Sequence, residues 1–270
     1  MQSKPHFRTA ASEGWTPAEY PRAALRDALV EAGIAGVNSH DRANVLWKIR
    51  RLEYGDPDLQ FGISGASGIP TVDVLALVAE AAGFAPDPGL REGPVEIDPE
   101  SVLAGCERIG ARLAEAAERG ERLILATGHP AALPLLYQET AGLVVAAGAK
   151  LLRPFDGVTW KELGRHRQIR YLGGVAVLTD RAGTKHTHSP DPMRRMLEEQ
   201  TPDLVFADHG FAGAAIEAGI DTVSIADVND PALVVAHDQG RAGPVVVMDD
   251  GRQPESYWPC FQAIASRFDE

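Results

Sequence analysis

Histidine and aspartate side chains follow three short apolar runs between residues 122 and 226 of this 270-residue chain. These residues are His129 after the run 122–126, Asp208 and His209 after 203–207, and Asp227, Asn229 and Asp230 after 222–226. Apolar runs of this length, separated by helical segments, predict the strands of a largely parallel sheet. Ligands bind beyond the carboxyl ends of such strands, so we expect these side chains to meet at one edge of the sheet. Imidazole and carboxylate groups gathered there could hold a metal ion or transfer protons.

His186 and His188 add a His-x-His pair in the segment 184–191. If this segment is extended, both rings point to the same side of the chain. Neutral imidazole binds metal ions and imidazolium donates to oxyanions, so the pair fits either a metal site or a phosphate site. A solvated sheet edge is the alternative. The residues that we expect to be catalytic are His129, His186, His188, Asp208 and His209.

The turn Thr127-Gly128-His129-Pro130 has two interpretations. It could be only a tight connection between a strand and a helix. It could also bind the substrate's phosphate, because Gly128 permits close backbone approach and Pro130 is suited to begin a helix whose free N–H groups attract anions. His129 would then contact the phosphate or act as a general acid.

Carboxylate and amide oxygens near these histidines suggest a divalent metal ion. The candidate ligands are Asp208, Asp227, Asn229 and Asp230. Such ligands suit Mg²⁺ or Mn²⁺ better than a structural zinc site, which needs cysteines. Asp230 precedes Pro231 and could instead be only a helix N-cap, and Asp208 could be a structural hydrogen-bond acceptor.

Two groups of basic residues could recognise a phosphorylated substrate or lie on a solvated surface. Arg42, Asn44 and Arg50 lie on a predicted helix, from which an arginine could bind phosphate through two hydrogen bonds. The second group lies in an expected loop before the strand 174–179 and consists of Arg165, His166, Arg167 and Arg170.

Hydrophobic periodicity predicts two parts. Residues 1–97 form a helical portion that could cap the site, with helices at 18–33, 41–54 and 71–83, a loop at 62–70 and a proline-rich linker at 84–99. Residues 98–270 form an α/β catalytic core. The expected fold is therefore α/β, with a Rossmann-like, mostly parallel sheet and helices on both faces.

The elements expected in the second part alternate along the chain. They are a helix that Asp98 caps and Pro99 begins, strands at 122–126, 149–152, 174–179, 203–207, 222–226 and 244–249, and helices at 130–145, 191–200, 210–218 and 230–239.

Composition limits the classes of function. The net charge is −12, which disfavours binding to a nucleic acid polymer or an anionic membrane. No apolar run approaches the length of a membrane span, and the N-terminus has no secretory pattern, so we expect a cytoplasmic protein. Cys106 and Cys260 are too few for a disulfide framework, and Cys106 fits a core position. The oligomeric state stays open, and a homo-oligomer is compatible with the sequence.

Four motifs together resemble those of an actinobacterial family of phosphatases. They are ATGHP at 126–130, HTHSPDPM at 186–193, ADHGFAG at 207–213 and DVNDPAL at 227–233, with weaker similarity in DRAN at 41–44 and GD at 55–56. The resemblance covers most of residues 40–240. This chain departs from the family pattern at Phe211, where tryptophan is usual, at Val228, where cysteine is usual, and in a longer stretch at 153–173.

The resemblance implies hydrolysis of a phosphate ester. Combined with the polar sheet edge, it predicts a phosphatase for a small phosphomonoester (a nucleotide, a sugar phosphate or a biosynthetic intermediate) with a divalent metal ion assisting. A phosphoenzyme formed on histidine or aspartate is an alternative mechanism. A metal-dependent hydrolase or lyase for another substrate, and a phosphometabolite-binding module without turnover, are alternative functions.

Overall fold

A mostly parallel sheet of eight strands forms the centre of the computed structural model, which describes residues 21–162 and 164–268. The strand order is β10-β9-β8-β3-β7-β6-β5, and β4 pairs with β3 beside β7. The strands are β3 (Arg122–Thr127), β4 (Lys150–Leu151), β5 (Thr159–Glu162), β6 (Arg165–Leu172), β7 (Val175–Thr179), β8 (Leu204–Asp208), β9 (Thr222–Ala226) and β10 (Val245–Val247). From β10 to β7 neighbouring strands are parallel, whereas β6 is antiparallel to both of its neighbours, β7 and β5.

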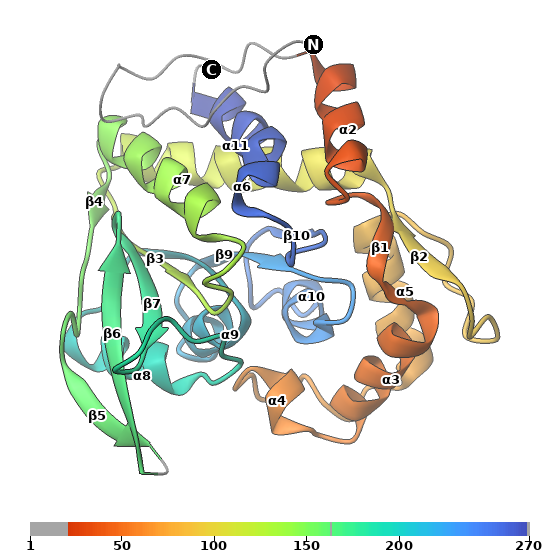
Figure 1. Cartoon of the computed structure of the whole chain (residues 1–270), viewed down its shortest axis with the longest axis horizontal. Coiled ribbons are helices and arrows are strands. Elements are labelled where there is room, and N and C mark those ends of the chain that lie inside the picture. Colours follow the sequence, from red (N-terminus) through yellow and green to blue (C-terminus); the bar gives the residue numbers. More distant parts are fainter. Residues whose placement is uncertain (1–20, 163, 269–270) are drawn as a thin grey trace.

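Helices cover both faces of this sheet, which is why its central strands are apolar throughout. Helices α6 (Pro99–Glu118), α7 (Pro134–Ala146) and α11 (Trp258–Ala265) lie on one side, and α8 (Asp191–Glu199), α9 (His209–Glu217) and α10 (Pro231–Asp238) lie on the other (Figure 1). Every residue of β7, β8, β9 and β10 is buried. Burial on both faces removes the alternation of polar and apolar residues, so these strands were predictable as apolar runs. The predicted α/β fold class is confirmed.

The N-terminal portion contains a small sheet that the sequence pattern did not predict. Its helices are α2 (Arg22–Glu31), α3 (Arg42–Glu53), α4 (Pro57–Gln60) and α5 (Thr71–Ala82), and residues 18–20 of the first expected helix lie outside the described residues. Strand β1 (Gly36–Asp41) pairs antiparallel with β2 (Pro94–Ile97). Residues 94–97 of the segment 84–99, which we predicted as a boundary or linker, therefore form a strand. Proline and glycine precede β2, which is a short edge strand where Pro94 is tolerated.

Two predictions in the second part also need correction. The basic segment at 165–172 is strand β6 rather than a loop, and only Ile169 in it is buried. An antiparallel strand with a solvated face can stay mostly polar, so the segment lacked an apolar signal. The helix expected to begin at Pro130 begins at Pro134. By contrast, Asp98 caps α6 as predicted, because its carboxylate accepts hydrogen bonds from the backbone N–H groups of Glu100 and Ser101.

One continuous hydrophobic core joins the two predicted parts. Leu29 and Val78 from the N-terminal portion belong to the same cluster of buried side chains as Leu123 and Phe206 from the sheet. Cys106 is buried in this core, as expected. The division at residue 97 stays a prediction. No helix in the described ranges is both long and apolar enough to cross a membrane.

Candidate active site

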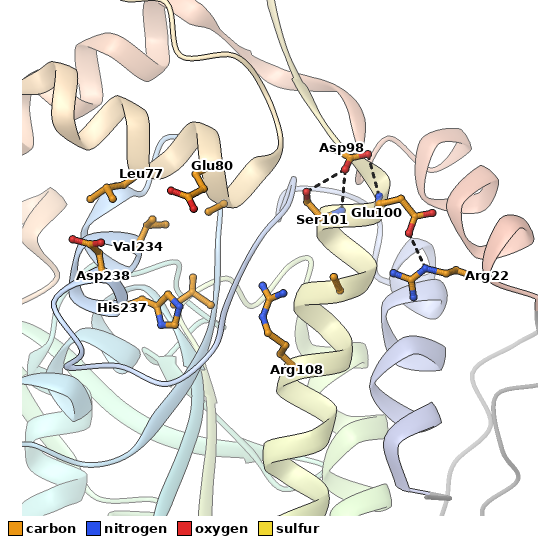
Figure 2. A pocket seen from close by; sticks show the side chains of 13 residues that line it. Arg22, Leu77, Glu80, Asp98, Glu100, Ser101, Arg108, Val234, His237 and Asp238 are labelled. Atoms are coloured by element: carbon orange, nitrogen blue, oxygen red, sulfur yellow. Dashed lines mark hydrogen bonds and ion pairs between the residues drawn. The ribbon is translucent and has the colours of Figure 1, made fainter.

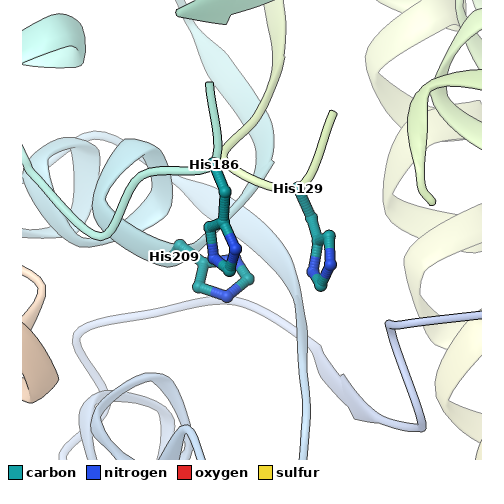
Figure 3. A group of neighbouring side chains, drawn as sticks. All are labelled: His129, His186 and His209. Atoms are coloured by element: carbon teal, nitrogen blue, oxygen red, sulfur yellow. The ribbon is translucent and has the colours of Figure 1, made fainter. Parts of the chain in front are cut away.

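The carboxyl ends of neighbouring strands bring the predicted histidines and aspartates together. His129 follows β3, His186 and His188 follow β7, and Asp208 and His209 lie where β8 gives way to α9. The four imidazole rings form a cluster in which neighbouring ring centroids are 4.6 to 5.6 Å apart. We call His129, His186, His188 and His209 the histidine cluster. Figure 3 shows three of these rings converging from separate segments.

His209 lies at the centre of the histidine cluster and is held by Asp208. The Nδ1 atom of His209 is 2.7 Å from Asp208 Oδ1, and both side chains are buried. His209 has a φ of 47°, a left-handed conformation that is uncommon for a residue with a side chain. Asp208 is the N-cap residue of α9, but its side chain makes no capping hydrogen bond. Its carboxylate instead accepts from His209 and from the Gly128 N–H, so it fixes both the ring and the turn after β3.

Two further carboxylates face the free sides of the rings. Asp230 Oδ2 lies 3.2 Å from His209 Nε2, and Asp250 Oδ1 lies 3.3 Å from His129 Nδ1. Asp230 is the N-cap residue of α10, yet its side chain makes no cap hydrogen bond. Asp250 was missed in the sequence analysis. The signal was present, because Asp249 and Asp250 follow the apolar run of β10 at the same sheet edge.

The carboxylates give the rings different proton affinities. Burial disfavours a charged His209, but Asp230 and Asp208 outweigh burial and raise its pKa well above the usual range. Burial likewise opposes charge on His129, and the ion pair with Asp250 outweighs it, so the pKa of His129 is raised. His209 and His129 are therefore the two rings of the cluster whose pKa values are raised by neighbouring carboxylates.

His186 and His188 have lowered proton affinity. Desolvation is the largest cause for both, and the positive charge of His209 adds to it. The pKa of His186 falls to about 4. At neutral pH these two rings carry free nitrogen lone pairs, which is the form that binds a metal ion.

The orientation of His188 is set by the N-terminal portion. Its Nδ1 atom is 3.0 Å from the backbone carbonyl oxygen of Asp58 in α4, so Nδ1 is the protonated nitrogen and Nε2 is left free. Phe61, at the end of α4, packs edge-on against the rings of His188 and His209. The helix α4 was not predicted, so this contact could not be expected.

Two sets of side chains have donor atoms close enough to bind one ion each. They are His129, His186 and His209, and His188, His209 and Asp230, with the donor atoms of each set within 4.8 Å of one another. His209 belongs to both sets. Since Asp208 occupies its Nδ1, only Nε2 is available as a ligand. This is the arrangement in which a carboxylate fixes the tautomer and direction of a metal-binding histidine.

Asp227 and Asn229, which we predicted as metal ligands, have other contacts. Asp227 Oδ1 accepts from Asn38 at 3.1 Å, and Asp227 Oδ2 lies 3.6 Å from Nε2 of His40. Burial and the nearby aspartates, first among them Asp250, raise the pKa of Asp227 well above its usual range. Asn229 donates to the side chain of Asn44 at 2.9 Å. These residues connect β1 and α3 to the site rather than joining either donor set.

The predicted anion cradle at 127–130 is not formed as expected. The Gly128 N–H donates to Asp208, and the His129 N–H donates to the Thr127 hydroxyl at 2.9 Å. No helix begins at Pro130, because α7 starts at Pro134. Gly128 is required for a different reason. A Cβ there would lie 2.4 Å from the Thr187 carbonyl oxygen, so glycine lets the two histidine-bearing loops touch.

The predicted substrate-binding residues of α3 lie on different faces. Asn44 contacts Asn229. Burial alone would raise the pKa of Asp230, but His209, then His188 and Lys48, outweigh it and lower that pKa, so Lys48, four residues after Asn44, is close to the site. The guanidinium of Arg42 instead lies 6.0 Å from the ring centre of Phe84, and Arg50 is exposed. Residues four apart share a helix face, so Lys48 is the basic residue that α3 presents toward the site.

Two cavities need to be distinguished. One of about 710 Å³ lies between α5, α6 and α10 and is lined by residues such as Glu80, Arg108 and His237 (Figure 2). No member of the histidine cluster lines it. Another of about 580 Å³ lies beside β5, β6 and β7 and includes His186 and Thr187 in its wall. Of these two cavities, the second adjoins the histidine cluster.

Comparison with known proteins assigns the chain to a family. A family model described as Phosphatase matches residues 20–269. The chain belongs to the Phosphatase family. Among curated members, Phosphatase SCO2771 of Streptomyces coelicolor (strain ATCC BAA-471 / A3(2) / M145) is 38% identical over 241 residues, which are 87% of this chain and 90% of the relative. The resemblance inferred from the four motifs is confirmed, and in this member of the Phosphatase family those motifs supply the histidine cluster, Asp208 and Asp230.

Proposed function

We propose that the protein hydrolyses a small phosphomonoester at the histidine cluster, with a divalent metal ion assisting. The observation that carries this proposal is the pairing of Asp208 with Nδ1 of His209, which leaves Nε2 directed at Asp230 and the other rings. Membership in the Phosphatase family supplies the reaction type. When bound, the metal ion would neutralise phosphoryl oxygens and lower the pKa of a bound water.

The donor set that we favour for the ion is His188, His209 and Asp230. Asp58 and Asp208 orient the two rings from behind, so both Nε2 atoms are free, and Asp230 adds a negative charge. Because two of the three donors are nitrogen, we expect Zn²⁺, Mn²⁺ or Fe²⁺ rather than Mg²⁺. This revises the ligand set that the sequence suggested, in which Asp208 and Asp227 were the principal ligands.

His129 and His186 are then left to act on the substrate. His129 is backed by Asp250 and partly exposed, so it can donate a hydrogen bond or a proton to the phosphate ester. In hydrolysis, the oxygen of water bonds to phosphorus, the ester P–O bond breaks, and the leaving oxygen takes a proton. The carboxylate behind His129 makes it a better donor of that proton than His186 or His188. His186 is exposed and would orient the leaving group.

A buried His209 also argues against the phosphoenzyme alternative. A nucleophile must reach phosphorus, whereas the His209 side chain is 3% exposed and is enclosed by Phe61 and the other rings. His209 therefore fits a ligand better than a nucleophile.

The test is phosphate release from an aryl phosphate by purified protein whose metal content is measured. We expect release to stop with a chelator and to return with Zn²⁺, Mn²⁺ or Fe²⁺. Asp230→Asn and His188→Gln should lower metal content and kcat together, while His237→Gln, on α10 but outside the cluster, should change neither. Release that persists in metal-free protein, with phosphate trapped on a residue, would favour a phosphoenzyme instead.

A further inference from the structure

The cavity beside His186 is lined mainly by basic side chains. Its charged members are the cations Arg165, Arg167, Arg181 and Lys185 and the anions Glu162 and Asp180. His166 also lines it. This positive balance is unusual for a chain whose net charge is −12. Cations this close together repel one another, and the positive potential that they create attracts an anion.

Ion pairs neutralise only part of this charge. Arg167 pairs with Glu162 at 2.9 Å, and Lys185 pairs with Asp180 at 2.8 Å. Arg165 and Arg181 form no ion pair with the residues that the structure describes, and both are exposed. Two guanidinium groups, each able to form paired hydrogen bonds to an oxyanion, are therefore available in the cavity wall.

The two arginines lie at the same end of a pair of strands. Gln168 of β6 pairs with Thr179, the last residue of β7, in antiparallel register, so the start of β6 lies beside the end of β7. Arg165 begins β6, and Arg181 lies in the turn after β7. Asp180 stabilises this turn by accepting from the N–H groups of Ala182 and Gly183, and the chain then continues to His186. Arg165, Arg181 and His186 all line the cavity, which therefore joins both arginines to the histidine cluster.

We propose that this cavity binds a second anionic group, phosphate or carboxylate, on the organic part of the substrate, and that Arg165 and Arg181 recognise it. This inference rests on the proposed function. A cavity of about 580 Å³ is large enough for a nucleotide or a sugar phosphate. The preferred substrates are therefore phosphomonoesters that carry another phosphate or a carboxylate, and simple esters are poor substrates.

The experiment compares matched substrate pairs with the metal-loaded protein. The pairs are fructose 1,6-bisphosphate with fructose 6-phosphate, adenosine 3′,5′-bisphosphate with AMP, and 3-phosphoglycerate with glycerol 3-phosphate. The first two pairs test phosphate and the third tests carboxylate. We expect kcat/KM to be higher for the more anionic member of at least one pair.

The double variant Arg165→Gln/Arg181→Gln should remove this preference. We expect kcat/KM for the more anionic member to fall by roughly 10-fold or more for each arginine, because a hydrogen bond to a charged group has that value. Phosphate release from an aryl phosphate should stay unchanged. Arg170→Gln, on the same strand but outside the cavity, is the matched control. Two outcomes would overturn the inference. One is equal kcat/KM for both members of every pair in the wild type, and the other is an equal loss of kcat/KM for all substrates in the double variant.

A binding measurement separates this inference from the proposed function. Fructose 6-phosphate and fructose are titrated calorimetrically into wild type and double variant with a chelator present. Phosphate-dependent binding that the double variant loses would support the cavity even if no ester is hydrolysed. Failure of the wild type to bind fructose 6-phosphate would overturn it, while an absence of phosphate release alone would count only against the proposed function.

Discussion

Asp208 and His209 are adjacent in sequence, and the left-handed backbone of His209 turns its ring back onto the Asp208 carboxylate, 2.7 Å from Nδ1. Adjacent residues in a strand point to opposite faces, so this contact depends on the break between β8 and α9. The strained conformation is held because Gly128 and Asp230 contact the same pair. An unusual backbone at a strand terminus is thus what gives the histidine cluster its central ring.

Asp208→Asn should reduce activity much more than stability. The amide keeps an acceptor for the Gly128 N–H but no longer holds His209 in the tautomer that leaves Nε2 free. We expect kcat or metal affinity to fall by roughly 10- to 100-fold, which is typical when a carboxylate behind a histidine ligand is lost. Steady-state kinetics and metal titration measure this. Asp203→Asn, at an exposed pair with Arg122, is the control. Full activity in Asp208→Asn would mean that the pairing has no catalytic role.

Gly210→Ala should destabilise the protein. A Cβ at Gly210 would lie 2.3 Å from the backbone carbonyl oxygens of His188 and Ser189, and backbone atoms cannot move aside cheaply. Overpacking of this kind costs about 1–3 kcal/mol, so we expect a clearly lower midpoint of chemical unfolding. Gly183→Ala is the control, because no atom lies within 4 Å of its added Cβ. Equal midpoints for the two variants would show that the loop carrying His188 yields easily.

Glu139 should make stability depend on pH. This side chain is buried in α7, Oε2 has no hydrogen-bond partner among the described residues, and burial raises its pKa to about 7 from 4.5. The folded protein therefore binds a proton that the unfolded chain releases near pH 4.5, and stability falls as pH rises from about 4.5 to about 7. The full penalty, at most about 3 kcal/mol, is present above pH 7.

Glu139→Gln should consequently raise the free energy of unfolding at pH 8 and leave it nearly unchanged at pH 4.5. Chemical denaturation at both pH values measures the difference. Glu118→Gln, exposed on α6, should have little effect at either pH. An equal gain for Glu139→Gln at both pH values would contradict a titrating carboxyl at this position.

Lys48→Ala should weaken substrate binding, whereas Arg50→Ala should not. Lys48 and Asn44 share the face of α3 that contacts the site, and Arg50 points elsewhere. We expect kcat/KM for an aryl phosphate to fall by roughly 10-fold in Lys48→Ala, from the loss of one charged hydrogen bond. A comparable fall in kcat/KM in both variants would instead support substrate recognition by an arginine of α3, as the sequence suggested.

The sequence predicted those features whose signals are local. Strands β8 and β9 are apolar runs, and polar residues follow each of them. Because the carboxyl ends of parallel strands meet at one edge of a sheet, the convergence of His129, His186 and His209 could be expected. Strand β1 has the sequence GVNSHD and carries no such signal. Its residues Asn38 and His40 reach the site only through pairing with β2, more than 50 residues away.

The proposed metal ligands were harder to predict than the histidines. Asp227 and Asp230 both follow β9, and the Pro231 that follows Asp230 favoured an N-cap role for Asp230 over a ligand role. Only the three-dimensional arrangement shows that Asp230 faces His209 while Asp227 faces Asn38. The contact between Asn44 and Asn229 spans 185 residues and likewise has no local signature.

The segment after β10 connects the β1–β2 pair to the histidine cluster. Asp249 accepts from the Ser39 N–H and donates its own N–H to the Ile34 carbonyl, and the next residue, Asp250, faces His129. A small shift of β1 would therefore change the distance between Asp250 and His129, and with it the ease with which that ring gives up a proton. Relatives with identical histidines would then differ in pH optimum through substitutions in a two-stranded sheet that lies outside the histidine cluster.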